Sequence, residues 1–226
     1  MRIRTCYELH TGKLTKPVSF GVVSDLHDEP YEDLWPLLED CDALLAPGDV
    51  VNRYTQTFDR GVGFLRDAAR RMPTFFSLGN HETKMQSFRT LMQALESTGA
   101  EILVNRYVSF GECWIGGWYD PEIVQKPDCM DEFEKLPGCR VLLCHKPEHY
   151  LKFLRSRDVD LAVAGHAHGG QIRIGSQGLY APGQHFFPKY TKGVVDGRLV
   201  ISAGAGNPCG MPRWGNPCEV LKITLD

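Results

Sequence analysis

The sequence has no apolar run that approaches the roughly 18 residues needed to cross a bilayer. Its first ten residues, MRIRTCYELH, also lack the apolar stretch of a secretory signal. From these two absences we expect a cytoplasmic chain without a membrane span.

Paired cysteine motifs are missing as well. Eight cysteines occur, but no two of them form a C-x-x-C pair, and Cys209 and Cys218 lack zinc-ribbon spacing. A chain of 226 residues buries enough apolar surface to fold without disulfides. The sequence therefore predicts reduced thiols and no structural zinc site.

An excess of positive charge is also absent. The 25 basic and 28 acidic side chains leave a formal charge of −3, which argues against an extended nucleic-acid track. With 42% hydrophobic and 23% charged residues the composition is that of an ordinary globular protein. Length and the lack of a composition break predict a single domain over residues 1–226, and nothing indicates an obligate protein partner.

Short apolar runs alternate with amphipathic segments, which is typical of strands joined by crossover helices and predicts an α/β fold. In the first half we expect strands at 18–24, 43–46 and 74–78 and helices at 31–40, 58–71 and 85–97. In the second half we expect strands at 101–108, 113–118, 140–144, 161–164, 171–174, 199–202 and 220–225, with one short helix near 148–157.

Side chains that are costly to bury follow these strands directly. They are Asp25, His27, Asp49, Asn80, His81, His145, His166 and His168. Each alone is commonly a turn, cap or core residue. Together they stand at the carboxyl ends of strands, where ligands bind in open α/β sheets. Imidazole, carboxylate and amide groups suit divalent first-row metal ions, so the joint pattern favours a metal site.

Five sequence blocks carry a family resemblance. They are Asp25-Leu26-His27, Gly48-Asp49, Gly79-Asn80-His81-Glu82, His145 and Gly165-His166-Ala167-His168. Their order resembles the D-x-H, G-D, G-N-H-[DE], H and G-H-x-H pattern of the calcineurin-like metallophosphoesterases, over residues 18 to about 170. The resemblance implies a four-layer α/β/β/α sandwich of two mixed sheets flanked by helices, with two metal ions between the sheet edges.

The same resemblance implies roles for the ligand residues. Asp25, His27, Asp49 and His168 would hold the first ion, and Asp49, Asn80, His145 and His166 the second. A hydroxide bridging the ions would attack phosphorus, and His81 would be the general acid for the leaving group. The ions could be Mn, Fe, Zn or Mg, with Mn or Fe favoured.

Arg53 ends a segment, Gly48 to Arg53, that resembles the G-D-x-V-D-R of phosphoprotein phosphatases, in which the arginine grips phosphate. We therefore take Arg53 as a catalytic candidate, with a solvated surface arginine as the alternative. Asn52 replaces the aspartate that orients the catalytic histidine in those enzymes. Glu82 either compensates for this change or holds the loop.

The C-terminal part resembles the YkuE-type and UDP-2,3-diacylglucosamine-hydrolase-like branch, which cleaves phosphodiester or pyrophosphate bonds. The resemblance lies in Gly169-Gly170-Gln171, the segments 179–183 and 187–190, and the Gly-rich run 204–208. For Phe186, Phe187 and Tyr190, core packing is favoured over a stacking platform for a substrate.

The prediction is a binuclear-metal phosphoesterase that hydrolyses a phosphodiester or a nucleotide-like small molecule. A phosphomonoesterase is the close alternative. A non-catalytic scaffold of the same fold and a nuclease remain as further alternatives, although related nucleases usually carry a capping domain.

Overall fold

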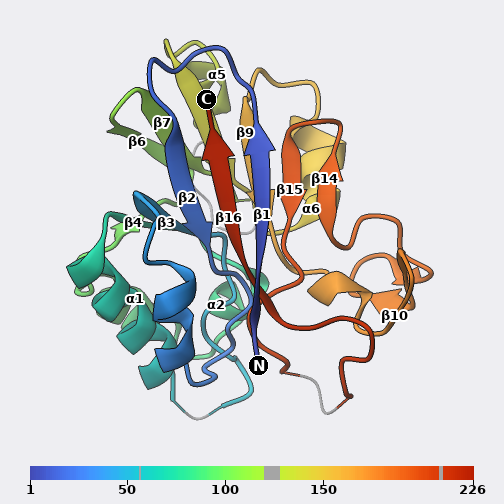
Figure 1. Ribbon diagram of the computed structural model, residues 1–226. Helices are drawn as coiled ribbons and strands as arrows, with labels where there is room; N and C mark the ends of the chain where they lie inside the picture. The colour runs from blue at the N-terminus through green and yellow to red at the C-terminus, as the bar shows by residue number, and fades with distance from the viewer. Residues whose placement is uncertain (56, 120–127, 209–210) are drawn as a thin grey trace.

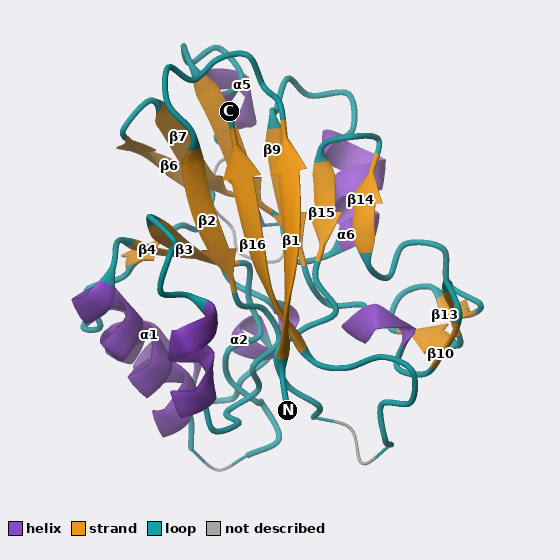
Figure 2. Cartoon of the chain, viewed as in Figure 1, coloured by secondary structure: helices purple, strands orange, loops and turns teal. Residues whose placement is uncertain are grey.

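The computed structural model describes residues 1–55, 57–119, 128–208 and 211–226. Two six-stranded sheets pack face to face, and helices cover their outer faces (Figures 1 and 2). This arrangement confirms the predicted α/β/β/α class with two mixed sheets.

The first sheet has the strand order β1-β16-β2-β3-β4-β5. Its strands are β1 (Ile3–Leu9), β2 (Val18–Val22), β3 (Ala43–Ala46), β4 (Thr74–Phe76), β5 (Glu101–Ile102) and β16 (Glu219–Leu225). Strands β2 to β5 run parallel, whereas β16 is antiparallel to β2 and parallel to β1.

The second sheet has the order β14-β15-β9-β8-β7-β6. Its strands are β6 (Arg106–Phe110), β7 (Cys113–Gly117), β8 (Cys139–Leu143), β9 (Leu161–Ala164), β14 (Gly193–Val195) and β15 (Leu199–Ile201). The four central strands are parallel, and the edge strands β6 and β14 are antiparallel to their neighbours.

Two short hairpins lie beside the second sheet, in the segment between β9 and β14. They pair β10 (Arg173–Ile174) with β11 (Gln177–Gly178), and β12 (Tyr180–Ala181) with β13 (His185–Phe186). This hairpin region forms one wall of the pocket described below.

Helical segments cover the sheets. They are η1 (Glu32–Leu37), α1 (Asp59–Arg71), α2 (Asn80–Thr83), α3 (Phe88–Glu96), α5 (Met130–Phe133), α6 (Pro147–His149), η2 (Tyr150–Leu154) and η3 (His168–Gly170). In the described part of the chain no helix is both long and apolar enough to cross a membrane.

The hydrophobic core lies in three layers because the central strands are buried on both faces. On β3, Leu44 packs under the helices and Leu45 packs between the sheets, since successive side chains of a strand point to opposite faces. On β8, Val141 lies between the sheets and Leu142 packs toward α5. A strand that is buried on both faces needs apolar side chains at every position, and the run ALLA at 43–46 is an example.

Several expectations differ from the structure. The strand expected at 101–108 is two strands, β5 and β6, which belong to different sheets. The helix expected over 31–40 is a short 3-10 helix, η1, because Pro36 lies inside it and cannot donate a backbone hydrogen bond. The strand expected at 171–174 excludes Gln171, whose φ of 58° is incompatible with a strand. Strand β1 was not predicted, although Ile3, Tyr7 and Leu9 show a partial alternation there.

The described cysteines are free thiols, as predicted: Cys6, Cys41, Cys113, Cys129, Cys139, Cys144 and Cys218. Cys209 lies outside the described residues.

Candidate active site

The predicted site residues converge at one edge of the two sheets. Asp25 and His27 follow β2, Asp49 follows β3, and Asn80 and His81 begin α2 after β4. From the second sheet, His145 follows β8, and His166 and His168 follow β9. The sheets therefore bring together side chains that are up to 143 residues apart in sequence.

Three groups of these side chains have ligand atoms close enough to hold a metal ion. They are Asp25 with His27 and His168, Asp49 with His145 and His166, and His27 with Asp49 and His81. In each group the atoms lie within 4.8 Å of one another. His27 and Asp49 each belong to two of these groups, so the three groups form one continuous cluster. Asn80 lines the same pocket with its amide.

Several ligand atoms are buried without a hydrogen-bond partner among the described residues. Both ring nitrogens of His27, Oδ1 of Asn80 and Nε2 of His145 are of this kind. Buried polar atoms are usually satisfied, and each unsatisfied one costs about 1–3 kcal/mol. Divalent ions would satisfy these atoms, so the residues present fit such ions.

The backbone of the ligand loops is strained. Asp25, His27, Asp49, His166 and His168 all have φ between 46° and 68°. For residues other than glycine this left-handed conformation costs roughly 1–2 kcal/mol each. Five such residues at one site indicate that the loops are held in place to aim their side chains.

Two motif glycines lie so close to a ligand carboxylate that no side chain fits at their positions. A Cβ atom on Gly79 would lie 2.1 Å from Oδ1 of Asp49, and one on Gly165 would lie 2.2 Å from Oδ2 of Asp25. Any side chain at these positions would displace a carboxylate. The glycines of G-N-H and G-H-x-H therefore make room for the ligands of the neighbouring loops.

Hydrogen bonds tie the two sheets together at the site. The backbone N–H of His166 donates to Oδ1 of Asp25 at 3.0 Å and so joins the sheets, whereas the N–H of His81 donates to Oδ1 of Asp49 at 2.7 Å within the first sheet. Nδ1 of His145 lies 2.8 Å from the carbonyl oxygen of Pro47. Because that carbonyl can only accept, Nδ1 carries a proton, and Nε2 is the nitrogen that faces Asp49 and that an ion would bind after displacing its proton.

The charge state of the site follows from burial and from Asp49. Burial lowers the pKa of His27 to about 3 and that of His168 to about 4, so both are neutral and able to bind a metal. Burial raises the pKa of Asp49, but the charge and hydrogen bond of His145, together with His27 and His81, hold that pKa well below its usual range. In the ion-free protein, burial would lower the pKa of His145, yet Asp49 at 3.2 Å raises it to about 9.

Glu82 holds the loops rather than the substrate. Its buried carboxylate accepts hydrogen bonds from the backbone N–H groups of Asp49, Val51 and Gly79, at 2.9, 3.2 and 2.7 Å. Burial, together with the charge of Asp49, raises the pKa of Glu82 to about 7. Of the two roles considered for Glu82, these contacts favour the loop-holding one.

His81 is oriented by backbone rather than by a carboxylate. The N–H of Arg53 donates to Nδ1 of His81 at 3.2 Å. Asn52 does not take the place of the missing aspartate, because its Oδ1 accepts the N–H of Tyr54 at 3.1 Å. The Arg53 side chain lies at the pocket, over the ring of Tyr54 at 4.7 Å.

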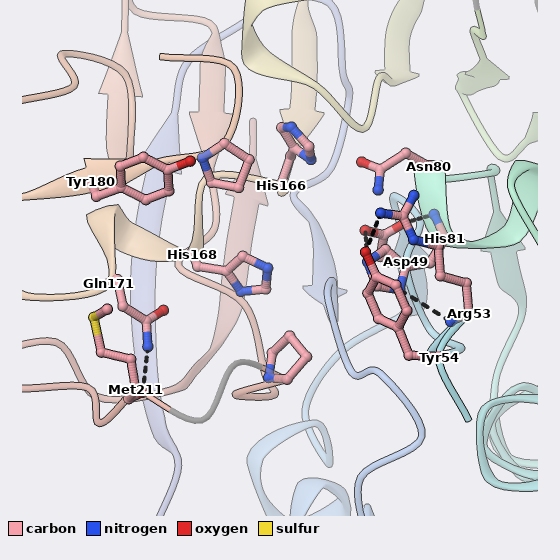
Figure 3. A pocket seen from close by; sticks show the side chains of 12 residues that line it. Asp49, Arg53, Tyr54, Asn80, His81, His166, His168, Gln171, Tyr180 and Met211 are labelled. Carbon is pink, nitrogen blue, oxygen red and sulfur yellow. Dashed lines mark hydrogen bonds and ion pairs between the residues drawn. The ribbon is translucent and has the colours of Figure 1, made fainter. Parts of the chain in front are cut away.

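A pocket of about 410 Å³ opens over these groups. Figure 3 shows Arg53, Tyr54 and His81 on one side of His166 and His168, and Gln171, Tyr180 and Met211 on the other. Pro182 and Pro208 complete the lining. The wall formed by Gln171, Tyr180 and Met211 was not among the predicted site residues. Gln171 and Tyr180 stand in segments that carry the C-terminal resemblance, but nothing in those segments alone indicates that they line the pocket.

The predicted core packing of Phe186 and Phe187 is wrong. Both side chains are 70% exposed, and Phe186 packs edge-to-face on Tyr180 with ring centroids 5.6 Å apart. Phe186 ends the two-residue strand β13, and Phe187 follows it directly. Tyr190 is half-buried against the outer core of the second sheet, as expected.

Comparison with known proteins agrees with the motifs. A family model described as calcineurin-like phosphoesterase matches residues 18–170. A metallophosphoesterase of Helicobacter pylori is 26% identical, covering 94% of this chain and 59% of the relative. The phosphodiesterase YaeI of Escherichia coli is 27% identical, covering 81% of this chain and 70% of the relative.

Among solved structures, a 5′-nucleotidase precursor from Thermus thermophilus matches with a TM-score of 0.49 and 16% identity, covering 70% of this chain and 43% of the other. The chain spans about half to three fifths of the curated relatives that it first matches, at 59%, 51% and 49% of their lengths. The family model covers well over half of the chain and includes every motif block described above. The chain belongs to the calcineurin-like phosphoesterase family.

Proposed function

We propose that the chain is a binuclear-metal phosphodiesterase that acts on a phosphodiester or nucleotide-like small molecule. The observation that carries this proposal is the pair of ligand groups that meet at the sheet edges, with Asp25 in one and Asp49 in the other. Their unsatisfied buried nitrogen and oxygen atoms support two ions rather than a purely structural cluster.

In this proposal Asp25, His27, Asp49 and His168 hold one divalent ion, and Asp49, Asn80, His145 and His166 hold the other. The donor set suits Mn, Fe, Zn or Mg, with Mn or Fe favoured by the histidines. Two such ions would activate a water molecule and neutralise phosphate oxygens.

His81 and Arg53 are the proposed catalytic residues. Because Nδ1 of His81 accepts the Arg53 N–H, the neutral ring carries its proton on Nε2, 4.0 Å from Oδ2 of Asp49. In this neutral state the Nε2–H can hydrogen-bond with the leaving oxygen and stabilise its developing charge, whereas transfer of a proton as a general acid requires the imidazolium form of His81. The Arg53 guanidinium lies at the same end of the pocket, where it can bind a phosphate oxygen.

The shape of the pocket supports a diester. Its lining continues to both sides of the metal ligands, with Arg53 and Tyr54 at one end and Tyr180 and Met211 at the other. A phosphodiester has two substituents to place, whereas a monoester has one. The name of the YaeI relative is consistent with the same preference.

The test compares bis(4-nitrophenyl) phosphate with 4-nitrophenyl phosphate, using protein loaded in turn with Mn²⁺, Fe²⁺, Zn²⁺ and Mg²⁺. We expect a higher kcat/KM for the diester with at least one ion. Turnover of the monoester alone would establish the phosphomonoesterase instead. Metal binding without hydrolysis of either ester would favour the scaffold, and cleavage of DNA alone would favour the nuclease.

Two broader statements stay predictions: that residues 1–226 form a single domain, and that the protein works in the cytoplasm on a small phosphoester substrate.

A further inference from the structure

We propose that Gln171 determines specificity, by accepting a hydrogen bond from a hydroxyl or amino group on the substituent that stays attached to phosphate. This inference rests on the proposed phosphodiesterase function and names the class of substituent that the pocket prefers.

Gln171 lies at the end of the pocket away from the proposed catalytic residues. It lines the pocket together with Tyr180 and Met211, and Figure 3 shows it beyond His168 from the Arg53 side. If His81 serves the leaving group at one end, the second substituent of a diester extends toward the other. Gln171, beside the Tyr180 hydroxyl, is then a polar side chain that this substituent meets.

The hydrogen bonds of Gln171 leave it only as an acceptor. Its Nε2 donates to the carbonyl oxygen of Met211 at 2.7 Å and to Oδ1 of Asn207 at 2.9 Å. Because a backbone carbonyl can only accept, the amide must be oriented with its nitrogen toward Met211. Oε1 is therefore fixed on the remaining side, and it makes no hydrogen bond with any described residue.

The backbone holds Gln171 in this place. His168, Gly169, Gly170 and Gln171 have consecutive φ values of 46°, 63°, 80° and 58°. The buried Asn216 clamps this turn, because its Nδ2 donates to the carbonyl oxygens of His168 at 2.8 Å and of Gln171 at 3.1 Å. The same strained turn thus places a proposed metal ligand and the Gln171 amide in one pocket.

The surroundings of Gln171 define the complementary group. Tyr180, Pro182 and Met211 offer mostly apolar surface, and the one cation among the described lining residues is Arg53, at the other end. Oε1 of Gln171 can only accept, and no cationic side chain lines this end of the described pocket, so a carboxylate or a second phosphate would be left without a partner there. It favours an uncharged substituent that carries a hydrogen-bond donor, such as a polyol or a sugar.

The test uses two esters that differ only in hydroxyl groups: 4-nitrophenyl 2,3-dihydroxypropyl phosphate and 4-nitrophenyl propyl phosphate. Both release 4-nitrophenolate, so the leaving group is constant. With Mn²⁺-loaded wild-type protein we expect kcat/KM to favour the dihydroxypropyl ester by about threefold to tenfold, the range for one neutral hydrogen bond. Equal values for the two esters would overturn the proposal.

Variants separate specificity from loop structure. Gln171→Met keeps the length of the side chain but removes the acceptor, and we expect the ratio to fall to about one. Asn207→Ala is the matched control, because it loosens the same contact to Met211 without removing Oε1. We expect it to change both rates in parallel and to keep the ratio. A Gln171→Met protein that keeps the wild-type preference would contradict the inference.

Binding measurements distinguish failure of this inference from failure of the proposed function. If neither ester is hydrolysed, the proposed function fails. The dissociation constants of 2,3-dihydroxypropyl phosphate and propyl phosphate for the Mn²⁺-loaded wild-type protein still test Gln171. Tighter binding of the dihydroxypropyl compound, lost in Gln171→Met, supports the role, and equal binding overturns it.

Discussion

The backbone N–H of Arg53 donates a hydrogen bond to Nδ1 of His81 over 3.2 Å. This contact fixes the ring proton of the neutral imidazole on Nε2, which faces the pocket. A carboxylate at position 52 would instead accept a hydrogen bond from a protonated Nδ1 and favour the imidazolium. With Asn52 turned toward Tyr54, His81 is held as a neutral hydrogen-bond donor.

Replacing His81 by alanine tests its role in leaving-group departure. We expect His81→Ala to lower kcat by about 10²- to 10⁴-fold on an alkyl phosphodiester, the range for losing a group that donates a hydrogen bond or a proton to the leaving oxygen. The loss should be smaller on a 4-nitrophenyl ester, whose leaving group needs little protonation. His10→Ala is the control, because His10 is exposed and pairs with Asp226. Elemental analysis should find two ions in both variants, and loss of an ion from His81→Ala would instead identify His81 as a ligand.

Removing the charge of Asp49 tests the shared carboxylate. Removing a residue that hydrogen-bonds to a metal ligand typically costs about 10- to 100-fold in activity. We expect Asp49→Asn to lower kcat/KM by more than this, because it weakens both ion sites at once. Asp40→Asn is the control, since Asp40 is an exposed carboxylate paired with Arg4 and Lys222. The measurement is the metal content and kcat/KM of each variant. An Asp49→Asn protein with full metal content and activity would contradict the assignment.

Glu82 gives a prediction about stability. The carboxylate of Glu82 accepts hydrogen bonds from the backbone N–H groups of Asp49, Val51 and Gly79. Glu82→Gln replaces one of its oxygens by an amide N–H₂, which cannot accept, so at least one of these buried N–H groups loses its acceptor. We expect the free energy of unfolding to fall by about 1–3 kcal/mol. Urea denaturation measures it, with the exposed Glu96→Gln expected within about 0.5 kcal/mol of wild type. Equal midpoints for the two variants would show that Glu82 does not hold the loops.

His145 gives a prediction about pH. The pKa of His145 in the ion-free protein is raised to about 9, so below that pH an incoming metal ion must displace a proton from the ring. The apparent metal affinity should therefore rise with pH up to about 9, and binding at pH 7.5 should release about one proton from His145. Calorimetric titrations in two buffers with different ionisation enthalpies measure this release. Identical heats in the two buffers would contradict the prediction.

The ligand set could be predicted from the sequence because each ligand stands directly after an apolar strand. Asp25 and His166 lie 141 positions apart and follow strands of different sheets. Parallel strands bring the ligands of each sheet to one edge, and the family resemblance implied that the two edges meet. The three layers of the core could likewise be anticipated from continuous apolar runs such as that of β3.

Other features depend on contacts that no local pattern encodes. The amide of Gln171 is fixed by Met211, 40 residues further along the chain. The orientation of His81 comes from a backbone N–H of Arg53, which any residue except proline could supply. The exposure of Phe186 and Phe187 depends on whether another layer covers their hairpin, and their aromatic character alone indicates the opposite.

The central claim is that two divalent ions assemble on the groups joined by Asp49 and that both are needed for hydrolysis. The most direct measurement is a titration of ion-free protein with Mn²⁺ that follows bound ions per chain and bis(4-nitrophenyl) phosphate hydrolysis in the same samples. We predict a final stoichiometry of two ions per chain, with hydrolysis rising as the second ion binds. Full activity at one ion per chain, or two bound ions with no hydrolysis, would contradict the account.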